Sequence, residues 1–181
     1  FRRAGIGLPR GGTSHDLTRL SRLLEASGAK DLWILGDVLH GAANDTLWQA
    51  SWRDWRARHA HVQVSALVGN HDRALAGAGL GIELLGEAVD DGPFALRHEP
   101  VAVADRHVLA GHLHPAVVLP GLQGRRWPVF WLRRGVTVLP AFSQFTGSLV
   151  VDPAGGERLA ICADGELAWV AGGGDIARGV R

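Results

Sequence analysis

Three short glycine-led motifs carry most of the residues that could bind a metal ion. They read Gly36-Asp37, Gly69-Asn70-His71-Asp72 and Gly111-His112-Leu113-His114, and each follows an apolar run that is typical of a buried strand. Ligand sites in open α/β sheets lie at the carboxyl ends of the strands. The pattern therefore predicts one rim of a sheet at which carboxylate, amide and imidazole groups meet.

The first two motifs differ in how specific they are. A carboxylate at Asp37 can bridge two divalent cations, but an Asp after a strand is also a common turn or cap residue. In the second motif Asn70 offers a neutral carbonyl ligand, His71 offers a proton donor, and Asp72 can hold that imidazole in one tautomer. The alternative for this motif is an Asx turn with a surface histidine.

The remaining histidines complete the candidate set. On extended chain, His112 and His114 would point to the same side, and Gly111 would let the backbone pass close to a metal. His98 follows another apolar run, Phe94 to Arg97, and its alternative is an ordinary core or surface histidine. Its position in the chain, between the second and third motifs, favours a role as a ligand.

The elements that must position these residues begin with helices and parallel strands. A helix is expected from a cap at Thr13 or Ser14 to Gly28, and a second helix from Asn44 or Asp45 with one face formed by Trp48, Trp52 and Trp55. Strands are expected at 31–35 and 62–68. The order strand, helix, strand predicts a parallel pair.

From Gly77 onward the sequence predicts short strands separated by Gly, Asp and Pro. They are expected at 82–85, 94–97, 107–110, 129–132, 136–139, 149–151, 158–162 and 167–170. The whole pattern predicts an α/β fold with two packed mixed sheets and helices outside. We expect one domain over residues 1–171 and a frayed tail over 172–181.

Composition limits the function classes only weakly. The chain has 181 residues, 46% of them hydrophobic, and a net charge of +1, which argues neither for nor against a nucleic-acid partner. Its single cysteine, Cys162, permits no intramolecular disulfide, so an oxidising compartment is not needed for stability. No apolar run approaches the ~20 residues of a membrane span. We therefore expect a cytoplasmic protein with no membrane partner.

Basic and aromatic residues alternate between Arg125 and Arg134. Such a stretch could stack unpaired bases and neutralise phosphates. The alternative is an ordinary strand with a buried aromatic face and charged ends. No helix-turn-helix or zinc finger is visible, so sequence-specific reading of a nucleic acid is not expected.

Together the motifs resemble the metallophosphoesterase (calcineurin-like) superfamily, whose paired metals cleave phosphate esters. Within this superfamily, the residues around the motifs are similar to those of the bacterial ligase-associated DNA damage response endonucleases, which are encoded beside a DNA ligase and a helicase. The segments that carry this likeness are FRRAGIGLPRG (1–11), GNHDR (69–73), HEP (98–100), AGHLHPAV (110–117) and LPAFSQFTG (139–147). The resemblance implies a four-layer αββα fold and a metal-dependent phosphodiesterase.

The resemblance also implies roles for single residues. Asp37 would bridge two divalent ions, with Mn²⁺ expected before Fe, Zn or Mg. The second ion would be completed by Asn70, His98 and His112, and the first would be bound by His114. His71 would protonate the leaving oxygen while Asp72 orients it. The candidate substrate-binding residues are His40, Arg73, Arg3, Trp131, Arg133 and Arg134.

One part of the family pattern is absent. The family opens with a strand that ends in D-x-H, and here this strand is expected upstream of Phe1, so the first metal site of this chain is incomplete. Ser14-His15-Asp16 has the residue types in the wrong order and at a helix start. We expect a nuclease acting on DNA in repair, on single strands or without sequence specificity, in association with a ligase and a helicase. A small-molecule phosphodiesterase and a non-catalytic scaffold are the alternatives.

Overall fold

The computed structural model describes residues 12–38, 46–69, 78–119, 124–143, 147–163, 166–170 and 176–178. The chain divides into two compact units, each with its own sheet. Unit 1 contains Phe1–Leu85 and Phe142–Thr146, and unit 2 contains Gly86–Ala141 and Gly147–Arg181.

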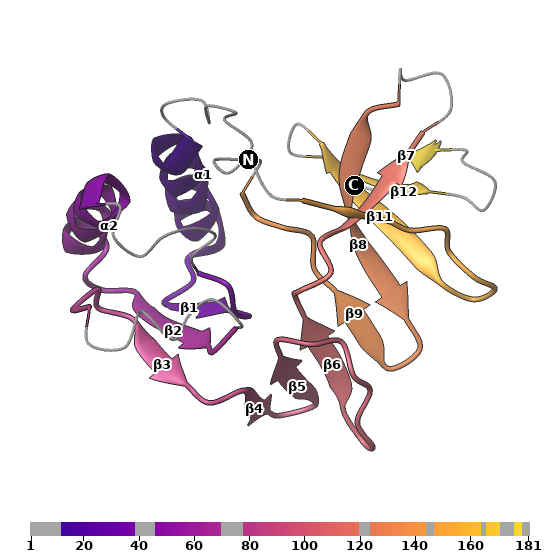
Figure 1. Cartoon of the computed structure of the whole chain (residues 1–181), viewed down its shortest axis with the longest axis horizontal. Coiled ribbons are helices and arrows are strands. Elements are labelled where there is room, and N and C mark those ends of the chain that lie inside the picture. The colour runs from indigo at the N-terminus through magenta and orange to yellow at the C-terminus, as the bar shows by residue number, and fades with distance from the viewer. Residues whose placement is uncertain are drawn as a thin grey trace. The chain divides into compact units, whose positions relative to one another are not determined.

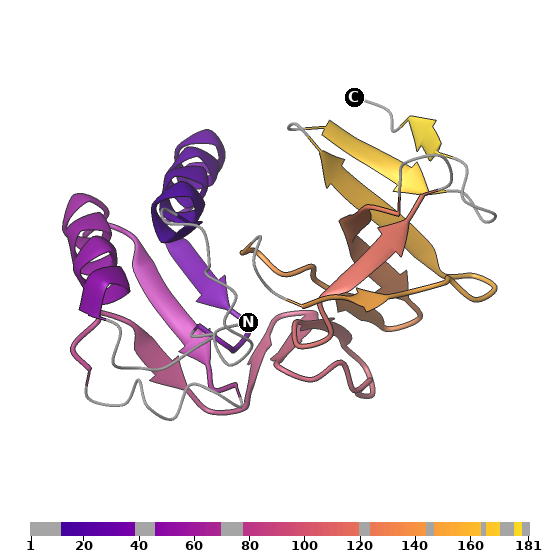
Figure 2. The ribbon, with the colours of Figure 1, turned by 45° about the horizontal axis from the view of Figure 1, so that its top comes forward.

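Unit 1 is a small parallel sheet with two helices. Its elements are α1 (Gly12–Ser27), β1 (Asp31–Ile34), α2 (Thr46–Arg58), β2 (Gln63–Leu67) and β3 (Glu83–Leu85). The sheet order is β1-β2-β3, and both neighbouring pairs are parallel, as the strand-helix-strand order predicts. Both helices lie beside this sheet in Figure 1, and Figure 2 shows them next to each other.

Tryptophans of α2 form the centre of the unit 1 core. Trp55 is fully buried, and its Nε1 donates a hydrogen bond to Ser21 Oγ of α1 at 3.0 Å. Trp52 stacks on Trp55 with ring centroids 5.1 Å apart and donates from Nε1 to the Leu80 carbonyl oxygen. Trp48 packs against the same cluster. The predicted tryptophan face of this helix is therefore confirmed.

The ends of α1 show one correct and one incorrect prediction. Gly28 has a φ of 65°, and its N–H donates to the Leu24 carbonyl oxygen at 2.9 Å, which is the expected glycine stop. The helix begins at Gly12, so Thr13 and Ser14 lie inside its first turn and the predicted cap is wrong. The Ser14 carbonyl oxygen accepts a hydrogen bond from Thr18 Oγ1, as an interior helical residue can.

In the described residues of unit 2, all the regular secondary structure consists of strands. They are β4 (Ala88–Asp91), β5 (Phe94–Arg97), β6 (His107–Ala110), β7 (Pro115–Val118), β8 (Arg126–Arg133), β9 (Val136–Val138), β10 (Leu149–Val150), β11 (Arg158–Ala163), β12 (Glu166–Val170) and β13 (Ile176–Arg178). The main path of the sheet is β13-β12-β11-β8-β9-β6-β5-β4, and β7 joins β8 and β10.

Two parallel pairs at the middle of this sheet position the histidine motifs. β5 pairs with β6, and β6 pairs with β9, in both cases parallel. Their inward side chains form a tight cluster in which Ala95, Val108, Ala110 and Val138 are fully buried. Such small and β-branched residues suit a central strand covered on both faces.

The fold class is confirmed as mixed α/β with two sheets. β5 and β6 lie at the residues predicted, whereas β4 and β7 were not predicted. β4 reads Ala-Val-Asp-Asp, without an apolar alternation, and β7 begins with a proline inside a motif interpreted as a ligand loop. Within 172–181, where a frayed tail was predicted, Ile176–Arg178 pair with β12. Neither described helix is long and apolar enough to cross a membrane.

Candidate metal centre

Asp37 sits on a sharp turn directly after β1. Gly36 has a φ of 89° and Asp37 a φ of 51°, so both residues lie in the left-handed region. Asp is one of the few side chains that tolerate this conformation. The turn ends the strand and places the carboxylate at the carboxyl end of the sheet.

The first two motifs meet at that end of the sheet. β1 and β2 pair in parallel with Ile34 opposite Ala66, and the same offset of 32 residues places Asp37 opposite Gly69. The two residues are in close contact, since a Cβ built on Gly69 would come within 2.5 Å of Asp37 Oδ1. Gly69 is the last described residue before Asn70.

His98 and His112 form a partly buried pair in unit 2. They follow β5 and β6, and the Gly111 N–H donates to the His98 carbonyl oxygen at 3.2 Å. His98 is only 5% exposed. The Nδ1 of His112 lies 3.0 Å from the Nε2 of His98, and the rings meet edge to face with centroids 4.7 Å apart.

This pair fits a bound divalent metal. Two ligand atoms at ~2.1 Å from one ion are about 3.0 Å apart when they subtend a right angle, and about 3.4 Å apart at a tetrahedral angle. The observed separation of 3.0 Å matches the first case, which is the angle of an octahedral ion. Without a metal, one neutral ring must donate its N–H to the other, which requires both rings to be in the same tautomer, Nδ1–H or Nε2–H.

His114 is held by one hydrogen bond, although its backbone differs from the prediction. His112 and His114 have φ values of 67° and 49°, so the interpretation of this segment as extended chain is wrong. The left-handed backbone removes the simple alternation of side chains. The Nδ1 of His114 lies 3.1 Å from the Gly147 carbonyl oxygen, which favours the Nδ1–H tautomer and leaves the lone pair on Nε2.

Unusual backbone conformation marks the candidate ligands. Among the described residues, four that are not glycine have a positive φ, namely Asp37, Asp105, His112 and His114. Three of these four are candidate ligands. Residues in sparsely populated conformations cost free energy and gather at functional sites, so this observation is independent support for the site.

Several predicted site residues lie outside the described part of the chain. They are Asn70, His71, Asp72, Arg73, His40 and Arg3. The described motif Ser14-His15-Asp16 lies within α1 and not after a strand, which agrees with its expected exclusion from the metal site.

Most of the arginine and tryptophan stretch forms β8, where Trp131 and Arg133 already have partners. Trp131 Nε1 donates to Glu157 Oε2 at 2.9 Å, and the guanidinium of Arg133 lies 4.7 Å from the centroid of the same ring. Arg133 Nε is also 3.4 Å from Glu157 Oε1. The ring of Trp131 packs on the core clusters of unit 2. This packing agrees with the alternative of a strand with a buried aromatic face.

Sequence reasoning missed Glu157, whose carboxylate contacts both Trp131 and Arg133. Burial raises its pKa, but the hydrogen bonds from Trp131 Nε1 and the Ala154 N–H, with the charge of Arg133, outweigh burial and lower the pKa below its ordinary value. The only sequence signal is an acidic residue at a Gly-Gly turn, Gly155-Gly156, before a strand. The role of the Gly147 carbonyl oxygen was missed too, although this residue closes the LPAFSQFTG segment.

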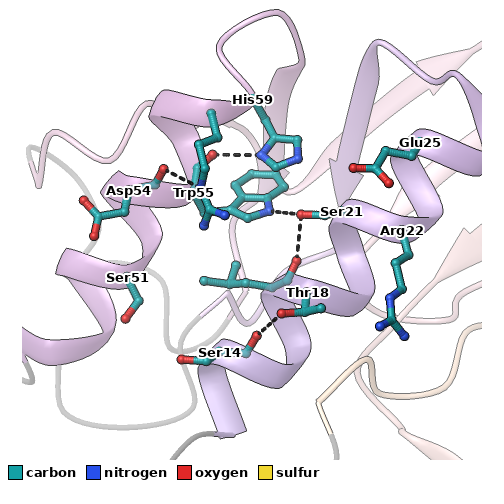
Figure 3. Close-up of a pocket in the computed structure, with 11 residues that line it drawn as sticks. Ser14, Thr18, Ser21, Arg22, Glu25, Ser51, Asp54, Trp55 and His59 are labelled. Atoms are coloured by element: carbon teal, nitrogen blue, oxygen red, sulfur yellow. Dashed lines mark hydrogen bonds between the residues drawn. The ribbon is translucent and has the colours of Figure 1, made fainter.

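A separate cavity in unit 1 contains none of the candidate ligands. It has a volume of about 550 Å³ and lies between α1 and α2. Figure 3 shows the hydrogen bond from Trp55 to Ser21 crossing it, and the contact between His59 Nδ1 and the Trp55 carbonyl oxygen. The hydrogen bond from Trp55 to Ser21 joins the two helices, whereas the His59 contact lies at the end of α2.

Comparison with known proteins shows which other proteins of mixed α/β class this chain is similar to. No protein-family model matches the chain, and no curated protein matches it. Among solved structures, the chain is similar to the Pseudomonas putida nuclease MPE, with 41% sequence identity and a TM-score of 0.77 over 87% of this chain and 79% of the nuclease. The chain belongs to the family of nuclease MPE. The match with the MPE family is long enough to include residues of both units.

Proposed function

We propose that this chain is a metal-dependent phosphodiesterase of the metallophosphoesterase type that cleaves DNA. The observation that carries the proposal is the partly buried pair of His98 and His112, whose ring nitrogens face each other at 3.0 Å at the ends of two parallel strands. Membership of the MPE family supports a nuclease, because the relative is described as one.

Two divalent ions, with Mn²⁺ the first choice, would be bound by residues of the three motifs and by His98. Asp37, His98 and His112 have donor types that suit such an ion, and by the family resemblance they would bind one ion. Asn70 would complete this ion, and His114 would bind the other together with Asp37. Carboxylate, amide and imidazole ligands of this kind suit Mn, Fe and Zn.

The chemistry divides between the ions and the side chains. Bound divalent ions supply charge for a phosphate and lower the pKa of water. His71 would donate a proton to the leaving oxygen, and Asp72 would hold the His71 imidazole in the required tautomer. The Gly147 carbonyl oxygen favours the Nδ1–H tautomer of His114. In this tautomer the lone pair is on Nε2, which would be the nitrogen that binds the metal ion.

DNA contacts would come from arginines that remain exposed. Arg125 and Arg134 lie at the two ends of β8 and are exposed. They are candidates for phosphate contacts, which position a strand without reading bases. Trp131 and Arg133 contribute to the packing of this surface through Glu157. A role in DNA repair with a ligase and a helicase rests on the sequence resemblance, as do the contributions of His40, Arg73 and Arg3.

The test compares metal content and hydrolysis in matched histidine variants. His98→Ala and His112→Ala should each lower the Mn²⁺ content per chain and abolish Mn²⁺-dependent cleavage of single-stranded DNA and of an aryl phosphodiester. His107→Gln is the control, because this histidine begins β6 but its Nε2 contacts Thr137 Oγ1 at 2.8 Å instead of the pair. The protein should be expressed from its complete gene.

The outcomes discriminate between the function classes. Cleavage of the aryl ester without cleavage of DNA would favour a small-molecule substrate. Metal binding without hydrolysis of either substrate would favour a scaffold. Unchanged metal content in both His98 and His112 variants would refute the proposed metal site.

A further inference from the structure

The backbone conformation at position 69 does not explain why this residue is a glycine. The described glycines with a positive φ include Gly28, Gly36 and Gly135, but Gly69 is not one of them. A residue with a Cβ could therefore adopt the backbone conformation of Gly69 without strain. The requirement for glycine must come from the surroundings of this residue.

Those surroundings are the backbone and carboxylate of Asp37. A Cβ at position 69 would lie 2.5 Å from Asp37 Oδ1 and 3.1 Å from Asp37 Cγ, and it would also meet the Asp37 backbone nitrogen. Nonbonded carbon atoms sit at about 3.5–4.0 Å from their neighbours. The carboxylate therefore occupies the space in which any other residue at position 69 would place its side chain.

The parallel register explains why this contact cannot easily relax. Asp37 lies opposite Gly69 through the continued pairing of β1 with β2. The Asp37 backbone is already in the left-handed region, so its φ has little freedom to change. A group added at position 69 must displace the carboxylate, the turn that carries it, or both.

We propose that Gly69 is a positioning residue for the metal site, because it leaves open the space in which the Asp37 carboxylate is held. This inference rests on the proposed function, in which Asp37 is a metal ligand. Gly69 itself donates no ligand and touches no substrate. Its contribution acts wholly through the position of Asp37.

The experiment compares Gly69→Ala with Asp37→Asn and with Gly155→Ala. Asn tolerates a positive φ as Asp does, so Asp37→Asn removes the charge without changing the turn. Gly155 has no positive φ, and a Cβ built there meets nothing within 4 Å, which makes it the matched control. The readouts are Mn²⁺ affinity by calorimetry and the thermal unfolding of the metal-free protein.

Gly69→Ala should weaken Mn²⁺ binding by roughly 10–100-fold, the range found when a group that orients a ligand is removed. Asp37→Asn should weaken it at least as much, and Gly155→Ala should leave it unchanged. In the double variant, Gly69→Ala should add no further loss of affinity to Asp37→Asn, because the carboxylate through which Gly69 acts is already absent.

Failure of the inference differs from failure of the proposed function. If Asp37→Asn weakens Mn²⁺ binding and Gly69→Ala does not, Gly69 is not a positioning residue, while the metal site stands. If Asp37→Asn leaves the affinity unchanged, Asp37 is not a ligand, and both ideas fall.

A variant that does not fold also gives an answer. If Gly69→Ala is unfolded, the double variant Gly69→Ala with Asp37→Gly should recover the melting temperature of Asp37→Gly alone. The second glycine removes the carboxylate and tolerates the left-handed turn. A double variant that stays unfolded would show that the crowding does not come from the Asp37 carboxylate and would overturn the inference.

Discussion

Replacing Glu157 with Gln should destabilise unit 2 without changing the affinity for DNA. Glu157 Oε2 accepts hydrogen bonds from Trp131 Nε1 at 2.9 Å and from the Ala154 N–H at 3.1 Å. Its Oε1 lies 3.4 Å from Arg133 Nε. Gln can keep its single oxygen toward Trp131 and Ala154 only by turning its NH₂ group toward the guanidinium of Arg133.

The magnitude follows from these three contacts. Hydrogen bonds to a charged acceptor contribute ~1.5–3 kcal/mol, against ~0.5–1.5 kcal/mol for a neutral one. Arg133 is 37% and Glu157 18% exposed, so solvent screens the ion pair to about 0.5 kcal/mol. Because solvent also reaches the two hydrogen bonds, the total loss should be about 1–2 kcal/mol, a fall in melting temperature of roughly 3–6 °C.

The pH dependence has a definite sign. Because the pKa of Glu157 is lowered in the folded protein, its charge stabilises the fold fully above the ordinary value of 4.5. That contribution is lost as the pH falls through the lower pKa of the folded state. The melting temperatures of the protein and of Glu157→Gln should therefore differ at pH 7 and converge in acid.

The assay pairs thermal unfolding from pH 7 to pH 3 with DNA binding measured by fluorescence anisotropy. If Arg133 contacts a phosphate, loss of the Glu157 charge would free its guanidinium and strengthen DNA binding. A variant with an unchanged melting temperature and a higher affinity for DNA would therefore refute the structural role assigned to Trp131 and Arg133. Asp152→Asn, at an exposed acidic residue of the same segment, controls for a general change of charge.

Three further predictions concern the core, the proposed acid and the DNA surface. Trp55→Ala should lower the free energy of unfolding by about 3–5 kcal/mol in urea, because a fully buried ring and its bond to Ser21 are lost; a loss below 1 kcal/mol would contradict this packing. His71→Ala should leave Mn²⁺ affinity intact and slow DNA cleavage by ~10²–10⁴-fold, with a smaller loss on activated aryl esters, and equal losses would argue against an acid. Arg134→Ala should weaken DNA binding and reduce its salt slope by about 1 unit, whereas an unchanged slope would exclude a phosphate contact.

The strands near the site could be predicted because their local pattern is unambiguous. Phe94–Arg97 and His107–Ala110 are short apolar runs bounded by Gly, Pro and Asp, and both match the structure residue for residue. The tryptophan face of α2 was predictable from its helical spacing for the same reason. In each case the information lies within a few neighbouring residues.

Features that depend on distant residues were not predictable. The left-handed backbone at His112 and His114 has no local signal, because neither residue is a glycine or an asparagine. The partner of Trp131 lies 26 residues away at Glu157, on the loop before a neighbouring strand. The contact of Gly69 with Asp37 depends on the offset between two strands, which the sequence does not state.

In both units a candidate ligand lies opposite a glycine of the neighbouring parallel strand. In unit 1, Asp37 follows one strand of a parallel pair and lies opposite Gly69, the first residue of the motif that follows the other strand. In unit 2, His98 follows one strand of a parallel pair and lies opposite Gly111, which donates its N–H to the His98 carbonyl oxygen. Each glycine leads directly into further candidate ligands, Asn70 in one unit and His112 in the other. Gly69 also leaves the space that the Asp37 carboxylate occupies, because a Cβ at this position would meet Asp37 Oδ1. The glycine of this motif therefore contributes to the candidate site through the position of a ligand, although it supplies no ligand itself.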